Sequence, residues 1–311
     1  MAEGFYIPAD NPNLSTGLQT ASESVFTMFT GRELQYKLCE SEAAADAWSG
    51  LQMGPSGVDI YRWGLTQSEL AALDLSEDGP DWSRGHLHEL IEHLSKGGTL
   101  PFHIKMKGGS AATLISNQGH LITNQHLVPG IQHFHEFPER TIVSDGVPMP
   151  HHSIKTASGV DLGAVRLVYV DSSIDLAILK LDTIPSQKPV VTRAKRVDRH
   201  ERVWHWGYPQ MTRRPSEQRA FFRYSDIERR QVYSVGLVLT DPSQSEWFTD
   251  ADSALGMSGA SVLDDDGCIV GLFWGGGAGG GSAASLPKSE RYRYRRVVDI
   301  RAFSERLPQF F

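Results

Sequence analysis

The spacing of apolar residues changes from a helical to a strand period near residue 100. Before that point, residues 21–49 are rich in Ala, Glu and Leu. Residues 83–95 carry leucine and isoleucine at positions i, i+3, i+4 and i+7, which is one face of a helix. Residues 66–69 are Thr-Gln-Ser-Glu, a capping box that opens a helix. We therefore predict that residues 1–100 form a mostly helical region.

From Phe102 onward, short apolar runs alternate with polar residues and are separated by turn residues, a pattern typical of antiparallel strands. The predicted strands include residues 111–116, 120–123, 160–170, 174–181, 231–240, 268–274 and 295–300. The strand at 174–181 is apolar on both faces, which predicts that it is buried. We expect a mainly β domain over residues 101–311.

A serine lies between two glycines directly before a short apolar run, in the sequence Gly256-Met257-Ser258-Gly259. Gly256 can adopt backbone angles that other residues avoid, and Gly259 lets another chain segment pass close by. Such a turn exposes a hydroxyl and leaves neighbouring backbone N–H groups free to face a developing oxyanion. The same motif also occurs as an ordinary turn before a strand, so by itself it does not establish a nucleophile.

A base for this serine has to come from earlier in the chain, because the last histidine is His205. An α/β-hydrolase needs its histidine after the serine, and a glycine where this chain has Ala260. Two upstream segments fit: a predicted hairpin that ends in His126, and the buried strand headed by Asp175. The carboxylate of Asp175 is costly to bury without a partner, and a histidine N–H would be such a partner. The alternative is that Asp175 stays at the surface and caps a loop. The order His126, Asp175, Ser258 is that of the chymotrypsin class.

Three segments carry a family resemblance: residues 123–128 (Thr-Asn-Gln-His-Leu-Val), 174–179 (Ile-Asp-Leu-Ala-Ile-Leu) and 256–259 (Gly-Met-Ser-Gly). Together they resemble the motifs of the trypsin-like, two-barrel serine peptidases, most of all the bacterial HtrA-type and glutamyl-endopeptidase-type branches. The resemblance covers residues 102–301.

This resemblance implies a mainly β fold with two six-stranded-type antiparallel β-barrels in residues 101–311. The mostly helical N-terminal extension, residues 1–100, would then be an accessory domain. The resemblance itself leaves that first part of the chain unexplained.

The chemistry that the resemblance implies is hydrolysis of peptide bonds through an acyl-enzyme. Ser258 would be the nucleophile, His126 the general base and acid, and Asp175 the residue that orients the imidazole. The backbone N–H groups of Gly256 and Ser258 would form the oxyanion hole. No metal and no cofactor is required, and the expected partner is a protein or peptide substrate. Animal-type zymogens carry Asp directly before the serine; Met257 stands there in this chain, so activation through that ion pair is not available.

In the same family, the residue six places before the nucleophile lies at the base of the primary specificity pocket. Here it is Asp252, which implies cleavage after Arg or Lys. The alternative is that Asp252 caps a turn or faces solvent. Phe273, Trp274, Gly275 and Gly276 correspond to the family's substrate-binding edge. Glutamyl endopeptidases have a histidine in place of Phe273, which argues against a preference for Glu.

The amino-acid composition limits which classes of function and which cellular locations remain open. Hydrophobic residues make up 40% and charged residues 22%, ordinary values for a soluble globular protein, and the net charge of −7 argues against binding of nucleic acid. Cys39 and Cys268 are too few for a disulfide framework, so reduced thiols are expected. We see no secretory signal and no apolar run that could span a membrane, so we expect a cytoplasmic location, although export without a leader would leave no trace.

Several alternatives stay open. The domain could be a catalytically inactive protease fold that serves as a binding module, since Met257 and Ala260 depart from the commonest family sequence. Residues 1–100 could regulate access or recruit a further partner, or they could only stabilise the core. The histidine-rich segment 133–152 could hold a metal, although no ligand spacing there is diagnostic.

Overall fold

The computed structural model describes residues 5–53, 59–71, 90–128, 140–149, 151–193, 196–209, 230–240, 246–253, 256–276, 295–300 and 310. These residues fall into two compact units. Unit 1 contains the described residues up to Thr30 and those from Gly109 onward, and unit 2 contains those from Gly31 to Gly108. Two strands, β1 (Val25–Cys39) and β4 (Phe102–Leu114), contribute residues to both units.

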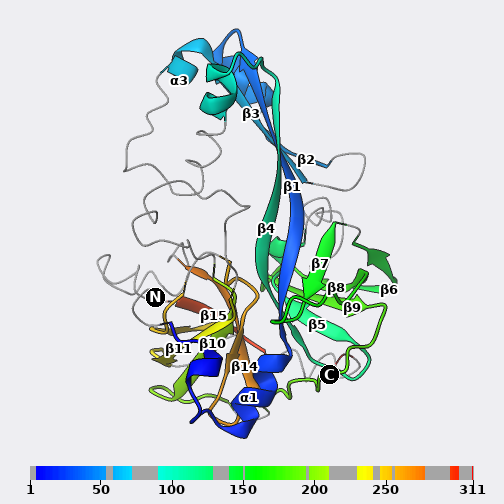
Figure 1. The fold of residues 1–311 in the computed structure, drawn as a ribbon, viewed down its shortest axis with the longest axis vertical. Helices are drawn as coiled ribbons and strands as arrows, with labels where there is room; N and C mark the ends of the chain where they lie inside the picture. The colour runs from blue at the N-terminus through cyan, green and yellow to red at the C-terminus, as the bar shows by residue number, and fades with distance from the viewer. Residues whose placement is uncertain are drawn as a thin grey trace. The chain divides into compact units, whose positions relative to one another are not determined.

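The first sheet of unit 1 curls around an apolar core (Figure 1). Its strands, in order, are β7 (His152–Lys155), the unit 1 parts of β1 and β4, then β5 (His120–Thr123), β9 (Leu176–Leu181), β8 (Val165–Asp171) and β6 (Arg140–Pro148). Met28, Leu114, Leu121 and Leu179 come from four different strands and pack in one buried cluster. Strand β9 is buried over almost its whole length, as its two apolar faces predict.

The second sheet of unit 1 has six strands, which pair antiparallel with their neighbours. In order they are β11 (Val232–Leu237), β10 (Arg202–Gly207), β13 (Ser261–Leu263), β14 (Ile269–Gly276), β15 (Arg295–Asp299) and β12 (Glu246–Thr249). The side chains of Trp206, Trp247, Val262 and Leu272 on these strands are fully buried. The two curled antiparallel sheets confirm the predicted mainly β architecture.

The N-terminal segment up to Thr30 packs within unit 1, with the residues of the two sheets. It contains η1 (Pro8–Asp10), α1 (Thr16–Glu23) and the start of β1. Tyr6 and Tyr233 exchange two backbone hydrogen bonds of 2.8 and 2.9 Å, and the N–H of Leu114 donates to the carbonyl of Ser24 at 2.9 Å. Residues 5–30 therefore belong to the same compact unit as the two sheets.

Unit 2 contains more strand than the sequence analysis predicts. Strands β1 and β3 (Asp59–Thr66) pair in parallel, and β2 (Gly50–Met53) pairs antiparallel with β3. Its helices are α2 (Glu42–Trp48), α3 (Gln67–Ala71) and residues 90–95. The first part of the predicted helix 83–95 lies outside the described residues. None of the described helices is long and apolar enough to cross a membrane.

The prediction of a mostly helical N-terminal extension is therefore wrong. Its composition suits a helix, but in β1 the buried residues Leu34 and Tyr36 alternate with the less buried Glu33, Gln35 and Lys37, which is the period of a strand. Pairing with a neighbouring strand and burial of one face outweigh the modest differences in helix propensity.

The capping box at the start of α3 is present as predicted. The hydroxyl of Thr66 accepts a hydrogen bond from the N–H of Glu69 at 3.2 Å, and the Glu69 carboxylate accepts one from the N–H of Thr66 at 2.7 Å. Local hydrogen bonding was thus predictable in this unit, whereas its sheet was not.

Candidate active site

His126 and Asp175 form a hydrogen-bonded pair in unit 1. His126 lies on η2 (Gln125–Leu127), directly after β5, and Asp175 lies directly before β9. These positions are neighbours because Thr123 pairs with Ala177 across the two antiparallel strands.

Both carboxylate oxygens of Asp175 are engaged by His126. The ring nitrogen Nδ1 lies 2.7 Å from Oδ2, and the backbone N–H of His126 donates to Oδ1 at 2.8 Å. The Asp175 side chain is 13% exposed and the His126 side chain 42% exposed, so the aspartate is mostly covered and the imidazole can be reached from solvent. This arrangement orients the imidazole and leaves its Nε2 for proton transfer.

The turn that carries Ser258 is tight and depends on its glycines. Gly256 and Gly259 have φ values of 88° and 77°, in the left-handed region that favours glycine, and the N–H of Ala260 donates to the carbonyl of Met257 at 2.9 Å. A Cβ on Gly259 would lie 2.3 Å from the carbonyl oxygen of Ala111. The positive φ of Gly256 and the close approach of Ala111 to Gly259 agree with the backbone properties that the sequence leads us to expect of these two glycines.

Hydrogen bonds hold the serine turn against the first sheet. The N–H of Ala111 donates to the carbonyl of Ser258 at 3.0 Å, and the N–H of Gly259 donates to Oδ1 of Asn124 at 2.5 Å. Asn124 lies two residues before His126, so these contacts bring the serine turn and the histidine together. Among the described residues the Ser258 hydroxyl and His126 form no hydrogen bond; such catalytic hydrogen bonds are often long before substrate binds.

Met257, directly before the serine, is fully buried. It packs beside Gly207, where an added Cβ would lie 3.4 Å from the Met257 methyl carbon and 2.8 Å from Cβ of Ala260. Packing in the core of the second sheet thus anchors Met257, which stands at the position where animal-type zymogens have the Asp of their ion pair. This burial gives a physical reason for an apolar residue at this place.

The residues of the predicted substrate-binding edge also lie in unit 1. Phe273 and Trp274 are on β14; Phe273 is buried, whereas Trp274 is half-buried with its ring 6.3 Å from the His126 ring, edge to face. Gly275 and Gly276 are the last residues of β14 and pair with β15. Trp274 therefore lies beside the imidazole.

Asp252 is exposed, and its backbone is well anchored. Its carbonyl accepts hydrogen bonds from the Ser234 hydroxyl at 2.7 Å and from Nδ1 of His205 at 3.2 Å. His205 is fully buried and its ring lies 4.2 Å from that of Phe273, so this histidine is packed in the core of the second sheet.

Two neighbouring aspartates of unit 1, Asp264 and Asp265, have pKa values shifted in opposite directions. Burial raises the pKa of Asp264, whereas hydrogen bonds from the Arg202 guanidinium hold the pKa of Asp265 below its usual range. Both residues lie in the turn after β13, and the Asp265 carbonyl accepts a hydrogen bond from Ser15 at 2.9 Å. Among the described residues, no three His, Cys, Asp or Glu side chains lie together as a metal site would need.

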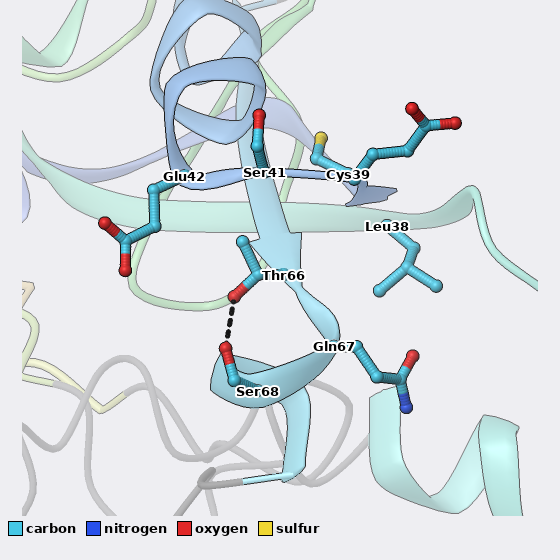
Figure 2. A pocket seen from close by; sticks show the side chains of 8 residues that line it. Leu38, Cys39, Ser41, Glu42, Thr66, Gln67 and Ser68 are labelled. Atoms are coloured by element: carbon cyan, nitrogen blue, oxygen red, sulfur yellow. Dashed lines mark hydrogen bonds between the residues drawn. The ribbon is translucent and has the colours of Figure 1, made fainter.

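Unit 2 has an open hollow of about 740 Å³ (Figure 2). It is lined by Leu38, Cys39, Glu40, Ser41, Glu42, Thr66, Gln67 and Ser68. Two of its three hydroxyl groups serve as helix caps: Ser41 accepts a hydrogen bond from the N–H of Ala44 at 3.2 Å, and Thr66 accepts one from the N–H of Glu69. The third, on Ser68, lies 3.1 Å from the Thr66 hydroxyl. The hollow contains none of the predicted site residues, so unit 1 remains the candidate for catalysis.

Comparison with known proteins agrees with this location. A family model described as the trypsin-like peptidase domain matches residues 109–272, more than half of the chain. The protein belongs to the trypsin-like peptidase domain family. His126, Asp175 and Ser258 all lie inside the matched range, and the family predicted from the three sequence motifs is confirmed.

Two solved structures of an HtrA-type protease show the same fold. The HtrA-type protease AlgW with a decapeptide matches with a TM-score of 0.50 and 15% identity, over 94% of this chain and 66% of that one. A variant of AlgW with a decapeptide matches with a TM-score of 0.51 and 13% identity over the same shares. The serine endoprotease from Yersinia pestis has a TM-score of 0.43 and 15% identity, over 65% of this chain and 57% of that one.

This chain therefore spans somewhat less than two thirds of the length of the AlgW chains. No curated protein matches.

Proposed function

We propose that the protein is a serine endopeptidase that uses His126, Asp175 and Ser258 as a catalytic triad. The observation that carries the proposal is the His126–Asp175 pair, whose Nδ1 to Oδ2 distance is 2.7 Å, next to a glycine-bounded serine turn held by Asn124. Membership of the trypsin-like peptidase domain family supports this function. The alternative of an inactive binding module is not favoured, because all three side-chain types are retained.

In the proposed reaction, Oγ of Ser258 attacks the scissile carbonyl carbon while its proton passes to Nε2 of His126. Asp175 holds the Nδ1–H and stabilises the imidazolium that forms. The carbonyl oxygen becomes an oxyanion that accepts hydrogen bonds from the N–H groups of Gly256 and Ser258. The C–N bond then breaks, and the leaving amine takes the proton from Nε2.

Water completes the reaction by the same route. It attacks the ester carbonyl of the acyl-enzyme as His126 removes its proton, and the Ser258 oxygen leaves with that proton. Positive φ at Gly256 supports the oxyanion role, because it allows the peptide of this turn to adopt an orientation that other residues avoid. Neither a metal nor a cofactor takes part in this scheme.

For the substrate we propose a protein or peptide that is cut after Arg or Lys. An exposed Asp252 carboxylate on an anchored backbone can pair with a basic side chain. A buried Phe273 offers no donor for a Glu side chain, which supports basic over acidic specificity. The two AlgW structures compared above are complexes with a decapeptide, which supports a peptide as the general class of substrate.

The remaining parts of the proposal concern the setting of the enzyme. We propose that it works in a reducing compartment such as the cytoplasm, which two free cysteines support. We also propose that unit 2 regulates access to the site or recruits a partner. Neither nucleic acid nor a membrane belongs to the proposed partners.

A fluorescent alkyl fluorophosphonate, which reacts with activated serines, tests the proposal together with a peptide-library cleavage assay. We expect the wild-type protein to be labelled and to cut peptides, and Ser258→Ala to do neither. Labelling that persists in Ser258→Ala, or a wild-type protein that neither reacts nor cleaves, would overturn the proposed function.

A further inference from the structure

The buried amide of Asn124 connects the two turns of the candidate site. Asn124 is fully buried and lies two residues before His126. Its Nδ2 donates a hydrogen bond of 3.2 Å to the backbone carbonyl of Asp175, and its Oδ1 accepts one of 2.5 Å from the backbone N–H of Gly259. One side chain therefore contacts the loop that carries the aspartate and the turn that carries Ser258.

The two groups that Asn124 contacts require opposite hydrogen-bonding partners. The carbonyl of Asp175 accepts hydrogen bonds, from Asn124 and from the N–H of Gln125. The N–H of Gly259 donates them, to Asn124 at 2.5 Å and to the Phe273 carbonyl at 3.1 Å. A side-chain amide carries both on one rigid planar group, whereas a carboxylate offers only acceptors and a lysine only donors. Among short side chains, asparagine thus fits this position for a chemical reason.

The loop that carries the aspartate has a backbone that needs support. Asp175 has a φ of 55°, which is uncommon for a residue with a Cβ, whereas the φ of 77° at Gly259 is one that glycine adopts readily. A conformation such as that of Asp175 persists when the surrounding structure holds it. At Asp175 the hydrogen bond from Asn124 is joined by one from the N–H of Gln125 at 3.1 Å.

We propose that Asn124 is a positioning residue that sets the separation of His126 and Ser258 by clamping the Asp175 loop and the serine turn to each other. This inference rests on the proposed function. Asn124 does not touch the substrate; it acts through the backbone of Asp175, whose carboxylate orients the imidazole, and through Gly259, which follows the nucleophile. Loss of the clamp misplaces the nucleophile relative to its base.

The test compares Asn124→Ala with Asn117→Ala, the same change at an exposed position in the turn between β4 and β5. Because a displacement of about 1 Å can cost roughly 100-fold in rate, we expect kcat of Asn124→Ala to fall on the order of 100-fold. We expect KM to stay within about threefold, because neither hydrogen bond of Asn124 goes to a residue of the substrate-binding edge. Labelling by the fluorophosphonate should slow by a similar factor, and Asn117→Ala should behave as the wild type.

A purely structural role gives a different pattern. If Asn124 only fills the core, Asn124→Ala has a lower melting temperature but keeps its kcat well below that temperature, and this result would overturn the inference. If Asn124→Ala does not fold, Asn124→Ser takes its place. Serine removes the bridging amide with less loss of polar character, and it should lose kcat in the same direction while KM is kept.

A readout independent of activity separates this inference from the proposed function. In protein with isotopically labelled glycine, hydrogen exchange at the Gly259 amide should be faster in Asn124→Ala than in wild type and in Asn117→Ala. A wild type without activity would reject the proposed function even if that exchange change were seen. Unchanged Gly259 exchange and unchanged kcat in Asn124→Ala would reject the clamp while the proposed function stands.

Discussion

The two aspartates assigned to the candidate site are held in opposite ways. Asp175 is 13% exposed, and both of its carboxylate oxygens are bound by His126. Asp252 is exposed, and what is held is its backbone carbonyl, by Ser234 and His205. In one region the fold positions the charged group itself, and in the other it positions only the segment that presents the charge.

This difference matches two different tasks. A carboxylate that orients a catalytic imidazole works best when its partner is permanent, because a fixed orientation needs no reorganisation during the reaction. A carboxylate that selects a substrate has to leave its oxygens available until the substrate arrives. The comparison therefore predicts that changes at Asp175 affect every substrate, and that changes at Asp252 affect only some of them.

The strongest test of the comparison is Asp175→Asn. Asparagine keeps the size of the side chain but favours the wrong tautomer of His126, so we expect kcat to fall by about 10⁴-fold for every peptide that the enzyme cuts. Steady-state kinetics with peptides that carry Arg, Lys, Leu or Glu before the scissile bond measure this. Ser258→Ala sets the background rate. A loss confined to basic substrates would contradict the role given to Asp175.

A carboxylate introduced at position 257 would be buried without a partner, which is a third environment to set beside those of Asp175 and Asp252. Met257→Asp places a charge in the fully buried position before the serine, and we expect a loss of about 3–5 kcal/mol of stability together with activity. Met257→Leu keeps the volume and should cost less than about 1.5 kcal/mol. Urea unfolding of both variants gives the values. Normal stability and turnover in Met257→Asp would show that this side chain is not held in the core.

Asp252→Asn tests the exposed aspartate of the comparison. A hydrogen-bonded ion pair with a substrate is worth about 1.5–3 kcal/mol, so kcat/KM for Arg and Lys substrates should fall roughly 10- to 100-fold. Substrates with Leu or Val at the same place should be unaffected. Matched fluorogenic peptides that differ only in this residue decide the question. A preference for Arg that survives the substitution would remove Asp252 from the specificity pocket.

The smallest effect is expected where an aspartate has a permanent partner but stays in solvent. Asp265 accepts two hydrogen bonds of 2.8 Å from Arg202, and both side chains are about half exposed, at 52% and 55%. Asp265→Asn should therefore cost at most about 1 kcal/mol of stability.

The pH dependence of this small contribution has a definite sign. Because Arg202 lowers the pKa of Asp265, the contribution is present above the ordinary aspartate pKa of about 3.9 and is lost as pH falls through the lower folded value. Melting curves of wild type and Asp265→Asn should converge in acid. A difference that grows as pH falls would refute the assigned partner.

The candidate site could be found from the sequence because its signals are local. Three short motifs identified His126, Asp175 and Ser258. The glycines around the serine indicated the backbone angles that the turn needs, since glycine adopts them at the lowest cost. The match of the trypsin-like domain over residues 109–272 contains all three motifs. Asn124 lay inside the first motif, but its role depends on a contact with Gly259, 135 positions away in the chain.

The first hundred residues show which structural features cannot be predicted from local sequence signals. Sequence alone determined the capping box at Thr66, because its hydrogen bonds join residues three apart. Tertiary structure decided that residues 31–39 form a strand, since pairing with β3 and burial of Tyr36 outweigh a helical composition. It also decided that Phe26 and Met28 belong to the core of unit 1, because the strands that complete that core lie more than eighty residues further along the chain.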